Sequence, residues 1–281
     1  MGKTSKKLLG LIAGSVLFAG SAMAQQDMAL EIEGALMTST APAPSHMENI
    51  DTIYSGWLFR ASQTQELELD DFENPGMIFV DVGLDLWAAA DGAAGKSCMD
   101  CHGGIDSMAG VRTSMPKIND AGEMWTMEDN INNCRTTRME ADAWKWDAPE
   151  MLAVTAAIGL QSRGMPVDVA IDGAAAEWWE RGRDLYYQRV GQLDMSCANC
   201  HEDNYGIHIR ADHLSQGQIN GFPVYRLKWA GLGSIHRRFK GCMKNIRATP
   251  YKAGSDEFTA LELYVASRGT GLSVESPAVR N

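Results

Sequence analysis

Hydrophobic and polar residues follow a helical spacing in two separate stretches of the chain, residues 79–90 and 174–190. Each stretch is followed closely by a glycine, Gly92 after the first and Gly191 after the second. A helix with one apolar face buries that face against another element, and glycine is common where a helix ends. The pattern therefore predicts two amphipathic helices that stop near glycines and pack by one face.

A third apolar stretch, residues 8–19, has the features of a targeting segment. Lysines at positions 3, 6 and 7 precede it, and Ala22-Met23-Ala24 follows it. A basic start, a short apolar run and an A-x-A site are typical of a secretory signal peptide. The run is shorter than the roughly 20 residues of a membrane span, although an uncleaved anchor is the alternative. We expect cleavage after Ala24, a periplasmic protein and no membrane span in the mature chain.

The most specific signal is a pentapeptide that occurs twice, as Cys98-Met99-Asp100-Cys101-His102 and as Cys197-Ala198-Asn199-Cys200-His201. Cys-x-x-Cys-His is the attachment motif of c-type haem. Both thiols bond to the haem vinyl groups, and the histidine binds the iron as its proximal ligand. A redox dithiol or half of a zinc site does not require that histidine. The sequence therefore predicts two covalently bound haem c groups.

The residues before each motif repeat as well, which indicates an internal duplication. A shift of 99 residues aligns identical residues: Gly83 with Gly182, Asp85 with Asp184, Leu86 with Leu185, Gly92 with Gly191, and Ser97 with Ser196. We predict a mostly α fold made of two tandem cytochrome c domains with an N-terminal extension.

The predicted boundaries are a signal peptide over 1–24, an N-terminal extension over 25–75, a cytochrome c domain with haem one over 76–170 and one with haem two over 171–281. The extension is rich in acidic, hydroxyl and proline residues and has little sustained periodicity. This composition indicates an extended arm or a small extension. We assign it no chemistry.

Two of the six cysteines lie outside the motifs, Cys134 after the first and Cys242 after the second. Two spare cysteines in an exported protein most often form a disulfide. In a duplicated cytochrome, however, each falls where the sixth iron ligand normally originates. Thiolate ligation of both irons explains their number and their position together, and a thiolate stabilises Fe(III).

Other distal ligands stay open at this point. Methionine is the standard one, and Met115, Met139 and Met243 are candidates, although most methionines serve packing. Met115-Pro116 resembles the Met-Pro loop of ordinary cytochromes, but the second copy reads Phe222-Pro223. The remaining histidines offer bis-histidine ligation: His46, His208, His213 and His236.

Charge separates the two copies. The chain is acidic, with a net charge of −11, which argues against a nucleic-acid partner. Residues 213–255 nevertheless contain no Asp or Glu and carry eight cations: Arg226, Lys228, Arg237, Arg238, Lys240, Lys244, Arg247 and Lys252. A solvated basic face is one explanation. Because these cations surround Cys242, they would also stabilise a thiolate and attract anionic substrates. This favours the second haem as the reactive one and the first as an electron relay.

With these features the chain resembles the SoxA family, the dihaem cytochrome subunits of SoxAX complexes, which are L-cysteine S-thiosulfotransferases of bacterial sulfur oxidation. The resemblance covers about Gly56 to the C-terminus. It depends on both haem motifs and both later cysteines, on Gln161-Ser162-Arg163-Gly164-Met165, and on the tail from Leu261-Glu262-Leu263-Tyr264 to Arg268.

The resemblance implies that Cys134 and Cys242 are the distal ligands of haem one and haem two. It also implies that Cys242 is catalytic and carries a persulfide, and that Arg238 holds the anionic substrate. Lys244 and Arg247 are weaker candidates for that task. If this region is helical, the spacing of four residues puts Arg238 and Cys242 on one face.

The implied reaction joins thiosulfate oxidatively to a cysteine of the SoxYZ carrier protein. The implied partners are a monohaem SoxX-like subunit in a heterodimer and a small cytochrome c that accepts the electrons. Two other functions stay open: a pure electron-transfer dihaem cytochrome, and a thiosulfate dehydrogenase that forms tetrathionate without a carrier.

Overall fold

The computed structural model describes residues 1–2, 29–210 and 212–281. The predicted signal peptide and its cleavage site after Ala24 thus lie outside the described residues, apart from the first two. Within the described ranges, no helix combines the length and the apolar character that a membrane crossing requires.

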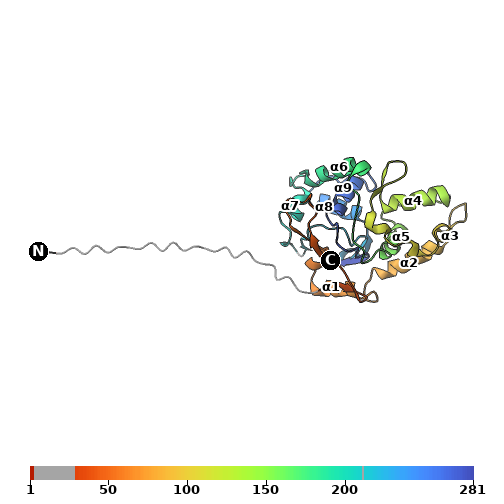
Figure 1. The fold of residues 1–281 in the computed structure, drawn as a ribbon, viewed down its shortest axis with the longest axis horizontal. Helices are drawn as coiled ribbons and strands as arrows, with labels where there is room; N and C mark the ends of the chain where they lie inside the picture. Colours follow the sequence, from red (N-terminus) through yellow and green to blue (C-terminus); the bar gives the residue numbers. More distant parts are fainter. Residues whose placement is uncertain (3–28, 211) are drawn as a thin grey trace.

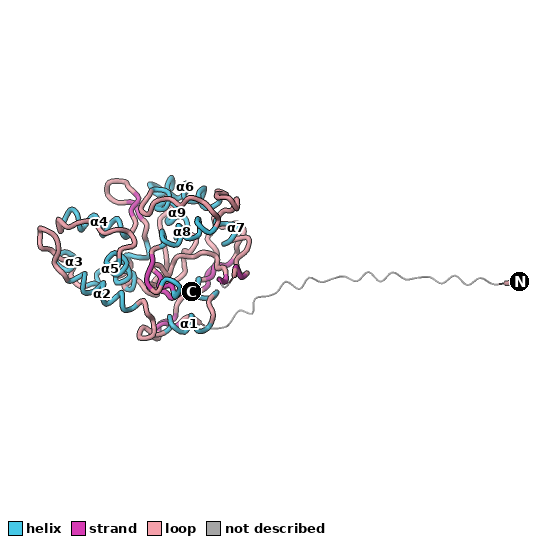
Figure 2. The backbone as a smooth tube through the Cα atoms, turned by 180° about the vertical axis from the view of Figure 1, so that it is seen from behind, coloured by secondary structure: helices cyan, strands magenta, loops and turns pink. Residues whose placement is uncertain are grey.

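The fold is mostly helical, as predicted, and its strands are short (Figure 2). The α-helices are α1 (Ser62–Leu69), α2 (Met77–Ala88), α3 (Cys98–His102), α4 (Met127–Arg138), α5 (Pro149–Leu160), α6 (Ala176–Tyr187), α7 (Cys197–His201), α8 (Ile235–Asn245) and α9 (Asp256–Ser267). The strands are β1 (Glu31–Ile32), β2 (Ala35–Leu36), β3 (Thr40–Pro42), β4 (Thr52–Tyr54), β5 (Lys117–Ile118), β6 (Met124–Trp125), β7 (His208–Ile209), β8 (Asp212–His213), β9 (Val224–Arg226), β10 (Gly231–Gly233) and β11 (Ala278–Arg280).

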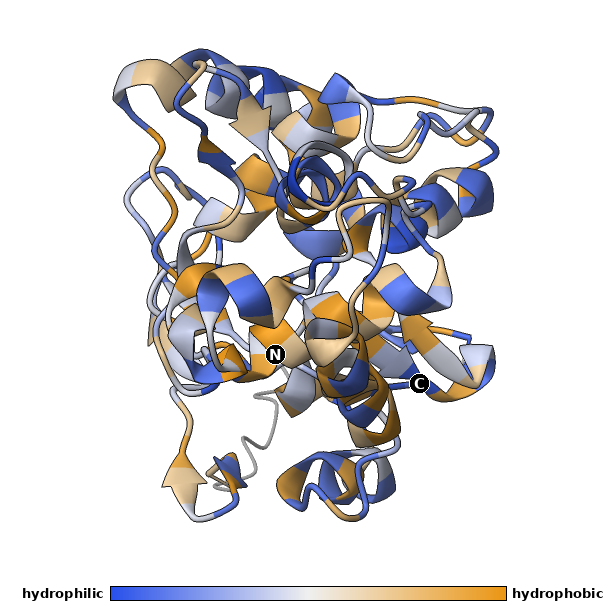
Figure 3. Cartoon of the chain, turned by 90° about the vertical axis from the view of Figure 1, so that its right-hand side faces the viewer, coloured by the Kyte–Doolittle hydropathy of each residue, from blue (hydrophilic) through white to orange (hydrophobic). Residues whose placement is uncertain are grey.

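Two sets of four helices follow each other along the chain. Figure 1 shows α2 to α5 on one side of the molecule and α6 to α9 on the other. The main helix pairs are α2 with α5 and α6 with α9. The predicted amphipathic stretches 79–90 and 174–190 are α2 and α6, with ends two or three residues away from the predicted ones. Most helices carry both hydrophobic and hydrophilic residues (Figure 3), in keeping with helices that pack by one face.

The repeated glycines sit where two backbones meet. A Cβ atom on Gly83 would lie 2.2 Å from the carbonyl oxygen of Ala153 in α5, and a Cβ atom on Gly182 would lie 2.0 Å from that of Ala260 in α9. Only glycine therefore permits these two helix crossings. The duplication in the sequence thus preserves the same close helix contact in both halves.

The N-terminal segment is a packed extension and not an extended arm. Its Trp57 and Ile53 side chains are fully buried. Ser55 donates a hydrogen bond to Glu275, and Glu68 forms an ion pair with Arg280 on β11. Since β11 runs parallel to β9 in a three-stranded sheet with β10, the segment is fixed to the second half of the chain. Short apolar runs separated by polar residues gave no periodic signal for this packing.

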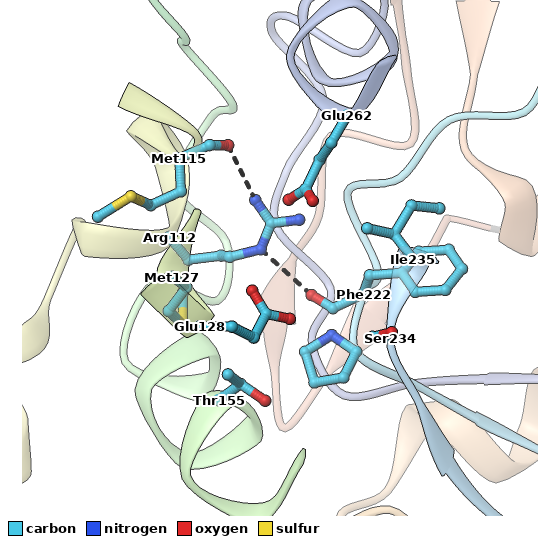
Figure 4. A pocket seen from close by; sticks show the side chains of 10 residues that line it. Arg112, Met115, Met127, Glu128, Thr155, Phe222, Ser234, Ile235 and Glu262 are labelled. Atoms are coloured by element: carbon cyan, nitrogen blue, oxygen red, sulfur yellow. Dashed lines mark hydrogen bonds between the residues drawn. The ribbon is translucent and has the colours of Figure 1, made fainter. Parts of the chain in front are cut away.

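A buried charged cluster joins the two halves (Figure 4). The Arg112 guanidinium donates to the carbonyl oxygens of Phe222 and Ile219, each at 3.2 Å. Glu128 of α4 and Glu262 of α9 approach it from opposite halves beside a cavity of about 20 Å³. Burial and the charge of Glu262 raise the pKa of Glu128 to about 7. Arg112 and His236 are the basic residues that lie close to this pair of buried carboxyls among the described residues.

Candidate haem and active site

Each Cys-x-x-Cys-His motif forms a one-turn helix, α3 in the first half and α7 in the second. A capping box starts each one: Ser97 with Asp100, and Ser196 with Asn199, exchange hydrogen bonds across the first turn. The two cysteines of a motif are three residues apart and so lie on the same side of the turn. This geometry presents both thiols and the following histidine to one ligand.

The His201 ring is held in a defined orientation. Its Nδ1 lies 2.8 Å from the carbonyl oxygen of Ser215, so Nδ1 carries the proton and Nε2 is left as the electron-pair donor. Gly217 adopts φ +81°, and a Cβ atom there would lie 2.9 Å from the imidazole Cγ. The Ser215–Gly217 segment therefore supports one face of the ring, which suits a histidine that binds iron through Nε2.

Helix α8 brings Cys242 to His201. The His201 side chain lies close enough to the Cys242 thiol to lower its pKa, and its Nδ1 is already engaged by the Ser215 carbonyl oxygen. The residues Arg238 to Cys242 are helical, as the spacing argument required, so both project from one side of α8. Imidazole nitrogen and cysteine sulfur are both among the side-chain donors that bind haem iron in proteins.

The pKa values of the two spare cysteines are shifted in opposite directions. Burial would raise the pKa of the Cys242 thiol, but the charges of Arg238 and Arg226 and the nearby His201 side chain bring it down to about 7. Burial and the proximity of Cys101 raise the pKa of Cys134, with only Arg138 opposing. The second half therefore stabilises a thiolate at neutral pH, and the first does not.

No disulfide links the spare cysteines, since all six cysteines lie in the described residues and all are unpaired. Cys134 lies near the thiols of Cys98 and Cys101, and Cys242 near those of Cys197 and Cys200. Each spare cysteine is thus grouped with the motif of its own half. The disulfide alternative requires Cys134 and Cys242 together, and the structure keeps them apart.

The alternative ligands serve other contacts. Met115 is buried in the core of the first half, and Met243 packs against the core of the second. His236 is fully buried, stacks on Trp146 at 4.2 Å and has its Nε2 3.1 Å from a Glu262 carboxylate oxygen. The remaining candidates also contact other residues: the main chain of Met139 lies against Gly92, the His46 ring packs edge-on against Trp179, and the His208 ring stacks on His213.

The cations around Cys242 differ in part from those expected. The charge of Arg238 acts on the thiol. Lys244 and Arg247 are exposed, and Arg247 instead reaches toward Gln192 at 3.4 Å. Arg226 of β9 does act on the thiol. Arg60, from the N-terminal extension, lies near enough to Arg226 and Arg238 to be affected by their charges.

Sequence reasoning did not identify Arg60 or Arg226 as site residues. In the sequence, Arg226 is one of eight cations in the basic segment, and no motif distinguishes it from the other seven. Arg60 precedes Cys242 by more than 180 residues in a segment to which no chemistry was assigned. Only the pairing of the N-terminal extension with the C-terminal strand brings it here.

Buried polar atoms around the second motif fit an additional bound group. Tyr186 Oη, Arg268 Nε and Nη2, and the Gln218 amide are buried without a hydrogen-bond partner in the described residues. Tyr186 and Arg268 adjoin Cys197, and Gln218 follows the glycine that supports His201. Buried polar groups are normally hydrogen-bonded. A haem, with its propionate carboxylates, supplies the kind of acceptor that the arginine requires.

Comparison with known proteins agrees with this chemistry. Residues 82–167 match the family model described as SoxA/TsdA, cytochrome c domain. The chain is 52% identical to the L-cysteine S-thiosulfotransferase subunit SoxA of Rhodovulum sulfidophilum, over 96% of each chain. It is 52% identical to the protein of the same name from Paracoccus pantotrophus, over 99% of this chain and 98% of the relative. The corresponding protein of Chlorobaculum tepidum is 37% identical, over 78% of this chain and 76% of the relative.

A solved structure shares the fold. The crystal structure of SoxXA from P. pantotrophus contains a chain that superimposes with a TM-score of 0.89 and 53% sequence identity. The match covers 91% of this chain and 99% of that chain. The similarity therefore extends over both halves and the N-terminal extension, beyond the single cytochrome c segment that the family model covers.

Proposed function

Because the chain belongs to the SoxA family, we propose that it is the haem c subunit of a periplasmic L-cysteine S-thiosulfotransferase, with its reaction centre at Cys242. The family assignment rests on relatives that are about half identical over nearly the whole length. The observation that carries the site assignment is the placement of Arg238 and Cys242 on one side of α8, with Cys242 beside His201 and both cysteines of the second motif.

We propose two haem c groups, one in each cytochrome c domain, with domains over 76–170 and 171–281. Cys98, Cys101 and His102 would hold haem one with Cys134 as the distal ligand. Cys197, Cys200 and His201 would hold haem two with Cys242 as the distal ligand. The repeated one-turn helices and the grouping of each spare cysteine with its own motif support this assignment.

The reaction joins the outer sulfur of thiosulfate to the sulfur of a carrier cysteine. One sulfur–sulfur bond forms, the carrier thiol gives up its proton, and two electrons are released. When bound, haem c would supply one-electron chemistry, so that the two electrons could leave singly toward a cytochrome c. Cys242 supplies a sulfur held as the anion, and as a persulfide it keeps a reactive outer sulfur.

Electrostatics explains why this site would take an anion. Arg238 lies on the same helix face as Cys242, and Arg226 adds a second charge. In a partly buried site such charges attract and orient a divalent anion far more strongly than in water. Cys134 has only Arg138 as an opposing charge, and it would serve as the ligand of an electron relay.

The partners follow from the family. The similar crystal structure is titled SoxXA, which supports a SoxX-like monohaem subunit in a heterodimer. The carrier would be a SoxYZ-like protein, with thiosulfate as the small-molecule substrate and a small cytochrome c as the electron acceptor. A signal peptide cleaved after Ala24 would place all of these in the periplasm.

The matched variants Cys242→Met and Cys134→Met test the assignment in the complete complex. Carrier modification is followed by its mass, electron output by cytochrome c reduction, and haem content by the mass of the subunit. We expect Cys242→Met to keep both haem groups and lose thiosulfate coupling, whereas Cys134→Met still modifies the carrier. Substantial coupling by Cys242→Met would contradict the catalytic assignment.

The same assay separates the rival functions. Tetrathionate formed without a carrier would identify a thiosulfate dehydrogenase. Cytochrome c reduction without any consumption of thiosulfate would identify a pure electron carrier. We expect consumption of thiosulfate only when the carrier protein is present.

A further inference from the structure

Arg226 has a buried donor without a partner. The residue is 4% exposed and ends strand β9. Its Nε donates to the main-chain oxygen of Asn281 at 2.6 Å, and its Nη2 lies 3.5 Å from an Asp212 carboxylate oxygen. Its Nη1 has no partner among the described residues. A buried guanidinium N–H without an acceptor is costly, because such groups are almost always hydrogen-bonded.

The surroundings of Arg226 contain more positive than negative charge. Arg60 and Arg238 lie close enough to act on it, and Lys228 shares Asp212 with it, at 3.4 Å from that carboxylate. Asp212 is the carboxylate that acts on both Arg60 and Arg226, and the thiol of Cys242 also lies close enough to act on Arg226. Burial and the charge of Arg238 lower the pKa of Arg226 to about 10, so it remains a cation at neutral pH. The group therefore favours an anion.

The fold places Arg226 close enough for its charge to act on the Cys242 thiol, and it restricts the movement of the side chain. The β9–β10 hairpin pairs Arg226 with Gly231 and leads into Ser234, which caps α8. The guanidinium lies over the Trp229 ring at 5.1 Å. The charge of Arg226 lowers the pKa of the Cys242 thiol on α8. A fixed donor beside a reactive sulfur is what orientation of a substrate requires.

Arg60 completes the arrangement from the N-terminal extension. Its guanidinium donates to the carbonyl oxygen of His213 and, at 3.1 Å, to Asn281 Oδ1. It thus ties together the two segments that hold Asp212 and Arg226. Arg60 is a positioning residue, because its own donors are already engaged by the protein.

We propose that Nη1 of Arg226 binds an anionic oxygen at the second haem site, and that this oxygen belongs to the sulfonate end of the thiosulfate anion. Arg238 and Arg226 then hold the substrate as a pair, with its outer sulfur directed to Cys242. The inference rests on the proposed function. A haem propionate carries the same oxygen chemistry, and the experiment distinguishes these two sources.

The test compares Arg226→Met with Arg237→Met in the haem-loaded heterodimer. Arg237 is a matched control: its guanidinium also lies over the Trp229 ring, at 4.3 Å, and within the described residues it donates to the Leu232 carbonyl oxygen at 3.2 Å. Each variant removes one charge and one stacked guanidinium. Arg226→Lys keeps the positive charge but replaces the planar set of guanidinium N–H donors by one ammonium group. It serves as a second variant if Arg226→Met does not fold.

Three quantities are measured: the Kd of thiosulfate by calorimetry, KM and kcat of carrier modification, and the reduction potential of haem two. We expect Arg226→Met to raise Kd and KM at least tenfold, the range of a lost charged hydrogen bond, with an unchanged potential. Arg226→Lys should recover part of the affinity, and Arg237→Met should change both constants less than threefold.

A shifted potential with unchanged Kd and KM would assign the Nη1 oxygen to a haem propionate. Equal behaviour of Arg226→Met and Arg237→Met in all three measurements would overturn the inference. A failure of the proposed function is a different result: the unmodified heterodimer would then neither bind thiosulfate nor modify the carrier.

Discussion

Replacing Gly182 with alanine should break the helix crossing that supports the second haem site. The added Cβ would lie 2.0 Å from the Ala260 carbonyl oxygen and 2.9 Å from the Tyr264 Cβ. Ordinary contact begins near 3.4 Å, so α6 and α9 must separate by more than 1 Å along this line. Overpacking of this kind costs about 1–3 kcal/mol. Alanine recovers about 1 kcal/mol of helix propensity, so the net loss should be up to about 2 kcal/mol.

Gly83→Ala and Gly241→Ala are the matched substitutions. Gly83→Ala meets the Ala153 carbonyl oxygen at 2.2 Å and should destabilise the first domain in the same way. Gly241 lies within α8 with open space around it, so alanine there should stabilise by about 0.5–1 kcal/mol. Urea unfolding of the haem-loaded chain, followed by haem absorbance and circular dichroism, measures all three. A Gly182→Ala protein as stable as Gly241→Ala would refute the close-crossing argument.

Further substitutions test individual contacts. Since the raised pKa of Glu128 means that the folded state holds this proton more tightly, stability should fall as pH rises from about 4.5 to 7. At 1.36 kcal/mol for each tenfold change this amounts to about 3 kcal/mol, and Glu128→Gln should remove that slope in urea unfolding at pH 5 to 8. Arg238→Met should raise the KM for thiosulfate at least tenfold, because a charge beside the site is lost, whereas Arg247→Gln should change it less than twofold. Gly217→Ala should displace the His201 ring and alter the optical and electron paramagnetic resonance signals of haem two only; unchanged spectra would contradict the support assigned to this segment.

The duplication could be predicted because each copy keeps its structural glycines at one spacing. A shift of 99 residues aligns α2 with α6 and α3 with α7, and the same shift puts Gly83 and Gly182 at equivalent crossings. It does not align Cys134 with Cys242, because the second half has nine more residues between the motif and the spare cysteine. The β7–β8 hairpin lies in that longer segment. The assignment of Cys134 to the first motif and Cys242 to the second therefore depends on their proximity in the folded chain.

The cationic site could be predicted only in part. A basic segment and a spacing of four residues were sufficient to propose Arg238, because α8 is local in sequence. Arg60 could not be predicted in this way, because it reaches the site through contacts between the two ends of the chain. The different acidities of Cys134 and Cys242 also depend on which charges the fold places beside each thiol.

Intact-mass spectrometry of the purified heterodimer, with peptide mapping before and after mild reduction, tests the central claim most directly. The account predicts haem on the peptides of both Cys-x-x-Cys-His motifs, and one extra reducible sulfur on Cys242 but not on Cys134. A disulfide between Cys134 and Cys242 would contradict it, because that bond would remove both proposed distal ligands and leave no thiolate to react.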